Sequence, residues 1–352
     1  MFVTLLLALS LVSCQGRPAS LPSQPSPTAS VTLEPTSTAI ATAMRTTALG
    51  DTPIPLTATP WPPIEDQILS LFDYDPQAPL DIEEVWVREL SSYTRYEITY
   101  ASPKGGRVPA GLFVPAKSSG PLAGIILMHG LPGNHNDNAS FAQGLVMTGA
   151  VVLMIDAPFA RPENINRKGW PLTFDEVDRL EQIQLMIDLR RGVDLLIARE
   201  DVDPERLAYV GYSYGGAMGG LLAGVEPRLK AFGLMVGDGG IVSHFTAADG
   251  TPLSELNSLP EEKRQAWLAL MEPIEPIRFI GRATPGSLFF QNALRDQAVM
   301  QDDALAYQAA GSEPKNIEWY KSDHFLPAEA FQHMVDWLGT KIGIDASRFK
   351  GP

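Results

Sequence analysis

The chain has 352 residues, of which 45% are hydrophobic and 19% are charged, and its formal net charge is −14. The apolar share is ordinary for a globular protein and excludes a wholly disordered chain. So acidic a chain is a poor general binder of nucleic acid, and we expect no nucleic-acid partner. The single cysteine, Cys14, excludes a disulfide framework, a Cys-rich zinc site and a cysteine nucleophile in the folded body.

The first residues are typical of an export signal. Residues 2–12 form a short apolar run, similar to the hydrophobic region of a secretory signal peptide. The run ends in LVSC, which resembles the bacterial lipobox, where a small residue precedes a cysteine that is lipidated and becomes the new N-terminus. The alternative is a buried N-terminal strand with an incidental cysteine. We expect a lipoprotein signal peptide over residues 1–13, and lipidation of Cys14 that anchors the protein to a membrane of the bacterial cell envelope, outside the cytoplasm.

The next segment, residues 14–63, has the composition of a disordered tether. It holds ten of the 30 prolines and many Ser and Thr residues, and its large apolar residues are few and scattered. Such a stretch cannot bury enough apolar surface to offset the loss of chain entropy on folding, and its prolines favour an extended conformation. We expect a spacer between the lipid and a folded domain over residues 64–352.

The folded domain opens with strands. Runs at 85–90, 93–101 and 108–115 are typical of strands, and the Gly-rich turn at 102–106 predicts a hairpin between the last two. Continuous apolar runs, typical of strands covered on both faces, follow at 123–128 and 150–155. Further strands are expected at 207–210, 229–236, 287–291 and 316–320.

Helices are expected between these strands. They cover 138–148, 174–199, 217–224, 260–270 and 328–341. Strands alternating with helices predict an α/β fold, with a mainly parallel sheet flanked by helices on both faces and antiparallel strands at its leading edge. The segment 241–282 is too long for a simple connection, so we expect a cap insertion over the carboxyl edge of the sheet, where ligands bind in such folds.

One motif carries the chemistry. Residues 211–215 read GYSYG and match the pattern G-x-S-x-G, with an apolar strand before it and a small-residue helix after it. Gly211 and Gly215 give room for a tight turn that lifts the hydroxyl of Ser213 above the sheet. Backbone N–H groups at the start of the helix are then free to stabilise an anion. Ser213 is the predicted nucleophile, and the alternative is a glycine-rich turn with an exposed serine.

A serine hydroxyl needs a general base, and the chain has five histidines. We favour His324, because it lies between the last strand and the last helix and therefore in a loop at the carboxyl edge of the sheet. His129 suits a structural role at the end of a buried strand. His135 follows in the same loop, His244 lies early in the cap, and His333 is on the last helix. No two histidines have the spacing of a metal-ligating pair with a suitable third ligand, so we expect no catalytic metal, and no cofactor.

The third member of the site is expected to be a carboxylate that orients the imidazole. Asp296 is favoured, because it follows the strand expected at 287–291 and one helix and one strand fit between it and His324. Asp238, which follows an earlier strand, is the main rival, and Asp302 and Asp303 are further candidates. Asp323 is adjacent to His324 and is expected to point away from it.

From about residue 64 to its end, the chain resembles the α/β-hydrolase superfamily, in which the triad has the order Ser, Asp, His. Within the superfamily it is most similar to the dienelactone hydrolase, acetyl xylan esterase and prolyl-oligopeptidase-like group. The likeness lies in RVPAGLFVP (107–115), HGLPG (129–133) and DVDPERL (201–207). The resemblance implies an oxyanion hole formed by the backbone N–H groups of Leu131 and Tyr214.

Two departures from the group narrow the expected function. Dienelactone hydrolases proper have a cysteine where this chain has Ser213, which favours serine esterase chemistry. Prolyl oligopeptidases carry a large propeller ahead of the hydrolase domain, where we expect a tether. We therefore expect an esterase that acts on a small-molecule ester. The alternatives are a peptidase or amidase with the same triad, and a non-catalytic surface protein that keeps the fold for ligand binding.

Overall fold

The computed structural model describes residues 53, 56, 61–117, 120–164, 171–247 and 250–352. The expected signal peptide, the lipidation of Cys14 and most of the expected tether lie outside these residues. In the described part of the chain, no helix combines the length and the hydropathy needed to cross a bilayer.

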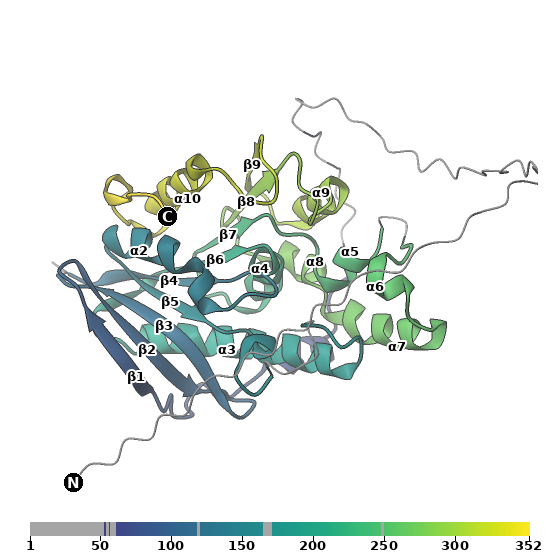
Figure 1. Ribbon diagram of the computed structural model, residues 1–352, viewed down its shortest axis with the longest axis horizontal. Coiled ribbons are helices and arrows are strands. Elements are labelled where there is room, and N and C mark those ends of the chain that lie inside the picture. Colours follow the sequence, from purple (N-terminus) through teal and green to yellow (C-terminus); the bar gives the residue numbers. More distant parts are fainter. Residues whose placement is uncertain (1–52, 54–55, 57–60, 118–119, 165–170, 248–249) are drawn as a thin grey trace, which may run out of the picture. The chain divides into compact units, whose positions relative to one another are not determined.

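Within the described residues, nine strands form a single sheet (Figure 1). They are β1 (Glu83–Glu89), β2 (Tyr93–Ala101), β3 (Arg107–Pro115), β4 (Leu122–Met128), β5 (Ala150–Ile155), β6 (Val202–Tyr212), β7 (Ala231–Met235), β8 (Leu288–Ala293) and β9 (Asn316–Tyr320). The spatial order is β1-β2-β3-β5-β4-β6-β7-β8-β9. The pairs β1–β2, β2–β3 and β3–β5 are antiparallel, and the remaining five pairs are parallel. The predicted mainly parallel sheet with an antiparallel leading edge is confirmed.

Helices cover both faces of the sheet (Figure 1). The longer ones are α2 (Ala139–Met147), α3 (Glu176–Ile197), α4 (Tyr214–Val225), α7 (Glu261–Met271), α9 (Gln301–Ala310) and α10 (Ala328–Ile342). Successive strand residues point to opposite faces. Ile126 of β4 therefore packs in the core that holds α3 and α4, whereas Ile125 packs in the core that holds α2 and α10.

Strand β6 is longer than the apolar run at 207–210 that predicted it. Its first half carries three charged residues and a proline at 203–206, which hide a strand from a hydropathy pattern. Val202 pairs with Leu122 of β4, and the register then shifts before Leu207 pairs with Gly124. The irregularity accommodates the polar residues at the amino end of the strand.

The insertion at 241–282 folds as a row of short helices. These are α5 (Ile241–Phe245), α6 (Ser254–Asn257), α7 and α8 (Pro276–Phe279). Helix α7 is fixed to α3, because the indole N–H of Trp267 donates to the carboxylate of Asp178 at 2.8 Å. Helix α5 directly follows the carboxyl end of β7, so the insertion begins at the sheet edge where the site was expected.

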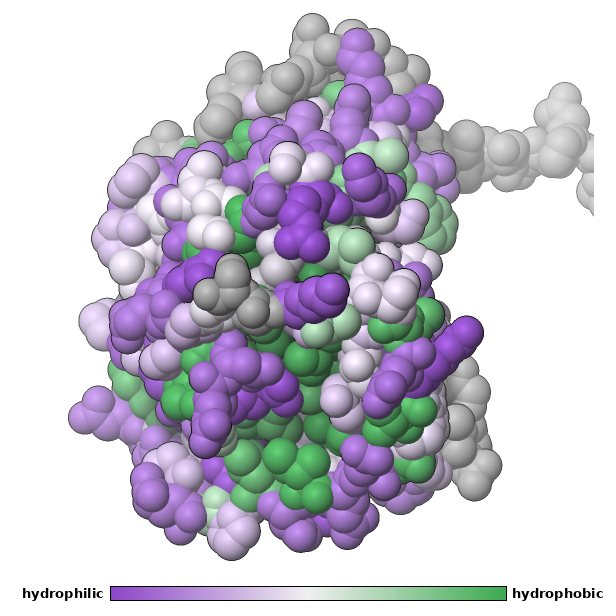
Figure 2. Space-filling view, turned by 90° about the vertical axis from the view of Figure 1, so that its left-hand side faces the viewer, coloured by the Kyte–Doolittle hydropathy of each residue, from purple (hydrophilic) through white to green (hydrophobic). Residues whose placement is uncertain are grey.

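The outer strand β1 is solvent-exposed along its whole length. Val85, Trp86 and Val87 are 64%, 42% and 38% exposed. Figure 2 shows the side of the molecule on which β1 lies, and hydrophobic residues gather in the lower half of this view. The pairing of β1 with β2 is irregular between Glu84 and Trp86. Irregular edges of this kind are less able to pair with another chain.

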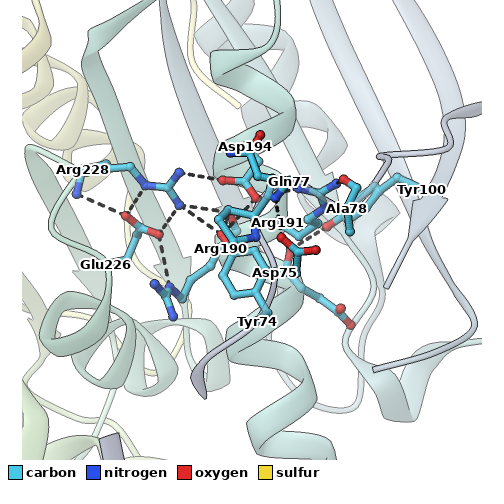
Figure 3. A network of polar contacts seen from close by, with 12 residues as sticks. Tyr74, Asp75, Gln77, Ala78, Tyr100, Arg190, Arg191, Asp194, Glu226 and Arg228 are labelled. Atoms are coloured by element: carbon cyan, nitrogen blue, oxygen red, sulfur yellow. Dashed lines mark hydrogen bonds and ion pairs between the residues drawn. The ribbon is translucent and has the colours of Figure 1, made fainter. Parts of the chain in front are cut away.

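A partly buried polar network ties residues 72–78 to the domain (Figure 3). Its centre is Asp194 of α3, which pairs with Arg191 at 2.8 Å and with Arg228 at 2.6 Å. The hydroxyl of Tyr74 donates to the same carboxylate at 2.9 Å, and burial raises the pKa of Tyr74 to about 12, so this phenol stays a neutral donor. Residues 72–78 therefore belong to the folded domain, and a truncation that leaves it intact must end before them.

Candidate active site

Ser213 lies in the turn between β6 and α4 with φ 54° and ψ −114°. A positive φ is strained for a residue other than glycine, and such strain is typical of a nucleophile held on a strand-to-helix turn. The turn is also closely packed. The Ser213 N–H donates to the Met235 carbonyl at 2.9 Å, and a Cβ on Gly215 would lie 2.6 Å from the Met128 carbonyl oxygen. The glycine requirement predicted for this turn is therefore met at Gly215.

Three predicted site residues come together at the carboxyl edge of the sheet. The His324 Nε2 atom lies 2.9 Å from the Ser213 Oγ atom, and the His324 Nδ1 atom lies 2.8 Å from Asp296 Oδ2. Asp296 follows β8 and His324 follows β9, and these strands are parallel neighbours. The Asp296 side chain is 4% exposed, and its Oδ1 also accepts the N–H groups of Ala298 and Val299. The carboxylate is thus fixed on one side of the imidazole and the hydroxyl on the other.

The rival carboxylates have other positions or partners. Asp238 accepts the Gly240 N–H at 3.2 Å and pairs with His244 Nδ1 at 3.0 Å. Asp323 accepts the Phe325 N–H at 3.0 Å. Asp302 and Asp303 lie in the first turn of α9. Within the described residues, the side-chain contact to His324 Nδ1 is made by Asp296.

The backbone beside Ser213 offers two donors. Leu131 follows β4, Tyr214 is the first residue of α4, and both line the cavity that contains Ser213. Within the described part of the chain, neither the Leu131 nor the Tyr214 N–H has an intramolecular acceptor. Two such N–H groups near a nucleophile can bind the oxyanion of a tetrahedral intermediate.

His129 has the structural role that its place in the sequence indicated. Its Nδ1–H donates to the Gly130 carbonyl at 2.7 Å, and its Nε2 accepts the Ala157 N–H at 3.1 Å. Burial lowers the pKa of His129, so the ring is neutral. Because the C=O and N–H of one trans peptide point in opposite directions, His129 fixes the orientation of the Leu131 N–H.

The cavity at Ser213 is small and mostly apolar, with a volume of about 240 Å³. Its walls come from α4, from the insertion and from the loops after β4, β5, β7, β8 and β9. The lining residues include Leu172, Ala217, Ile241, Phe245, Ala298 and Val299, with Asp238 and His244 as polar members. A small apolar group fits such walls. Within the described residues, no three His, Cys, Asp or Glu side chains are arranged to hold a metal ion.

A second histidine cluster beside the Leu131 loop was not predicted. His135 Nδ1 lies 2.6 Å from Asp156 Oδ1, and His135 Nε2 lies 2.9 Å from Glu97 Oε2. Burial acts to lower the pKa of His135, but the hydrogen bonds to Asp156 and Glu97 outweigh it and raise this pKa to about 9. The three residues come from the loop after β4, the end of β5 and β2. Without the strand order, the sequence does not indicate that His135 contacts Asp156 and Glu97.

We expect the His135 cluster to stabilise the fold in a pH-dependent way. The folded state keeps the His135 proton up to about pH 9, whereas the unfolded state loses it near the ordinary value of 6.5. The contribution is therefore complete below pH 6.5 and is lost as pH rises through about 9, a change of about 3 kcal/mol. Urea unfolding of wild type and His135→Gln should show the stability difference shrinking between pH 6 and pH 10. A difference that stays constant or grows would contradict this assignment.

The sheet topology and the strand–turn–helix at Ser213 define the class of protein: it is an α/β-hydrolase. The family model of acetyl xylan esterase matches residues 74–246, and that of the prolyl oligopeptidase family matches residues 174–339. Each match covers just under half of the chain. Both are to the acetyl xylan esterase, dienelactone hydrolase and prolyl oligopeptidase-like group that the sequence resembles, and the protein is an enzyme of the ester hydrolase type.

The chain is also similar to individual proteins. A protein of Escherichia coli (strain K12) named "Putative carboxymethylenebutenolidase" is 25% identical over 258 residues, which cover 67% of this chain and 83% of that protein. The structure of acetyl xylan esterase 1 from Thermoanaerobacterium sp. JW/SL YS485 has a TM-score of 0.65 and 17% identity, and covers 80% of this chain and 95% of that one. The acetyl xylan esterase from Paenibacillus sp. R4 has a TM-score of 0.59 and 18% identity, with 78% and 92% covered. These structures share the fold.

Proposed function

We propose that the protein hydrolyses carboxylic ester bonds through a Ser213–His324–Asp296 triad and an acyl-enzyme intermediate. The observation that carries the proposal is the continuous contact from Ser213 Oγ through both nitrogens of His324 to Asp296. This is the relation in which a histidine can accept the serine proton while a carboxylate orients the ring. The order of these residues along the chain, Ser213, Asp296 and His324, is the order of the triad in the α/β-hydrolase superfamily.

In the proposed reaction, Ser213 Oγ attacks the ester carbonyl and His324 Nε2 accepts its proton. The oxyanion of the tetrahedral intermediate is bound by the N–H groups of Leu131 and Tyr214. The intermediate collapses, and His324 gives the proton to the departing alcohol, which leaves an acyl group on Ser213. Water then attacks the acyl carbonyl with His324 as base, and the acid is released as Ser213 recovers its proton. Asp296 stabilises the imidazolium at each stage.

The cavity supports a small-molecule ester as substrate. A volume of about 240 Å³ is below the usual range of about 300–1,000 Å³ for ligand pockets. Its apolar walls favour a short acyl or alcohol group rather than a long chain. The names of the similar proteins, which include acetyl xylan esterases, agree with a short acyl group.

A panel of p-nitrophenyl esters graded from acetate to decanoate tests this proposal. We expect kcat/KM to be highest for two to four acyl carbons and to fall by at least ten-fold at decanoate, because the longer chain does not fit the cavity. The match to the prolyl oligopeptidase family favours amide hydrolysis as the second candidate. Acetyl anilide, measured beside phenyl acetate, separates the two. Faster cleavage of the anilide, or no preference for short acyl groups, would contradict the proposal.

We further propose that a lipid on Cys14 holds the enzyme to a membrane of the cell envelope. The support is the apolar run that ends at Cys14 and the Pro-, Ser- and Thr-rich segment that follows it. Stable anchoring requires two acyl chains, because one chain binds only weakly and reversibly.

Fractionation of bacteria that express the full chain tests this anchor. We expect wild type in the membrane fraction and Cys14→Ser outside it. A chain that lacks residues 1–60 keeps the network around Asp194 and should be soluble and active. An equal distribution of wild type and Cys14→Ser between the fractions would refute the lipid.

A further inference from the structure

The residue before the nucleophile contacts the loop that carries the base. Tyr212 ends β6 and directly precedes Ser213. Its hydroxyl donates to the His324 carbonyl at 2.6 Å and accepts the Leu326 N–H at 3.2 Å. The Tyr212 ring also packs edge-on against the imidazole of His324, with the ring centroids 5.9 Å apart. One phenol thus binds the backbone on both sides of Phe325.

The rest of the loop shows why this contact matters. Backbone N–H groups of Leu294 and Arg295, in the loop that also carries Asp296, hold the carbonyls of residues 320 and 322 at 2.9 and 3.0 Å. These bonds fix the loop before His324. Beyond it, Phe325 is 77% exposed and its ring contact is edge-on with the His324 imidazole, and Leu326 is the next residue that packs in the core. Among the described residues, the hydrogen bond to the His324 carbonyl comes from Tyr212.

The phenol is suited to both bonds. A hydroxyl can donate one hydrogen bond and accept another, and the two backbone groups require both. Burial raises the pKa of Tyr212 to about 12, so the hydroxyl keeps its proton over the whole range in which a histidine base works.

We propose that Tyr212 is a positioning residue of the reaction: its hydroxyl holds the backbone of His324 at a fixed distance from Ser213. The inference rests on the proposed esterase mechanism. Because Tyr212 and Ser213 are adjacent in the chain, the same strand end places the nucleophile and the anchor of its base. The Ser213–His324 hydrogen bond is then fixed locally, and a misplacement of about 1 Å costs about 10²-fold in rate.

The test compares Tyr212→Phe with wild type and with Tyr100→Phe. Tyr100 is a matched control, because its buried hydroxyl also donates to a backbone carbonyl, that of Asp188 at 2.8 Å, and it does not line the cavity. For Tyr212→Phe we expect a folded protein, kcat on p-nitrophenyl acetate lowered about 10–100-fold, KM within about three-fold of wild type, and labelling by a fluorophosphonate slowed in parallel. Tyr100→Phe should keep wild-type kcat even where its melting temperature falls.

The outcomes separate a failure of the proposed function from a failure of the positioning role of Tyr212. If wild type lacks esterase activity, the proposed function fails, and this inference fails with it. If wild type is active but Tyr212→Phe keeps kcat within two-fold, only the positioning role is overturned. The same holds if Tyr212→Phe does not fold, or if Tyr100→Phe loses kcat to the same extent, because the hydroxyl would then serve stability and not the histidine loop.

Discussion

Replacement of Ser213 by alanine is expected to lower turnover of a short ester by about 10⁴–10⁶-fold while the domain stays folded. Alanine removes the Oγ atom that contacts His324 Nε2 and forms the acyl bond, but it removes no core contact. The measurement is kcat on p-nitrophenyl acetate beside a melting curve. Ser258→Ala, at an exposed serine after α6, is the control and should turn over ester like wild type.

The result that would contradict the account is a folded Ser213→Ala variant with more than a tenth of wild-type turnover. Residual hydrolysis is expected, because the backbone donors of Leu131 and Tyr214 would still bind the oxyanion while water attacks directly. This residual turnover should remain several orders of magnitude below the turnover of wild type.

Asp296→Asn is expected to cost about 10⁴-fold in kcat, with little change in substrate binding. Asparagine keeps the shape of the carboxylate, but it neither stabilises the imidazolium nor enforces the Nδ1–H form of His324. The matched control is Asp238→Asn, the same chemical change at a carboxylate that pairs with His244 in the same cavity. That variant should mainly affect stability or KM.

Both variants are measured on one ester after their folding has been matched. A larger loss of kcat in Asp238→Asn than in Asp296→Asn would assign the triad acid to Asp238. Equal losses would show that neither carboxylate is the specific partner of His324.

The proposed nucleophile and its two proposed partners could be predicted because each lies a few residues after the end of a strand that the sequence predicts. Parallel strands end at one edge of the sheet, so Ser213, Asp296 and His324 had to lie near that edge. The interval between Asp296 and His324 fits one helix and one strand, and α9 and β9 occupy it. The choice of Asp296 over Asp238 was less determined by sequence, and the geometry separates them by their histidine partners.

Other features depend on contacts that sequence patterns do not encode. His135 meets Asp156 and Glu97 only because β2 and β5 lie on either side of β3 in the sheet. Tyr212 occupies a variable position of the G-x-S-x-G pattern, and its role is visible only once its hydroxyl is seen on the His324 loop. The start of β6 lies outside the apolar run at 207–210, so a pattern of apolar residues does not predict it.

The most direct test of the central claim is to find where the covalent intermediate forms. The full chain is treated with a fluorophosphonate until ester hydrolysis stops, and the adduct is located by peptide mass spectrometry. The account predicts one adduct per chain, on Ser213, with no labelling of Ser213→Ala and much slower labelling of His324→Ala. An adduct on another residue, or active enzyme that remains unlabelled, would contradict it.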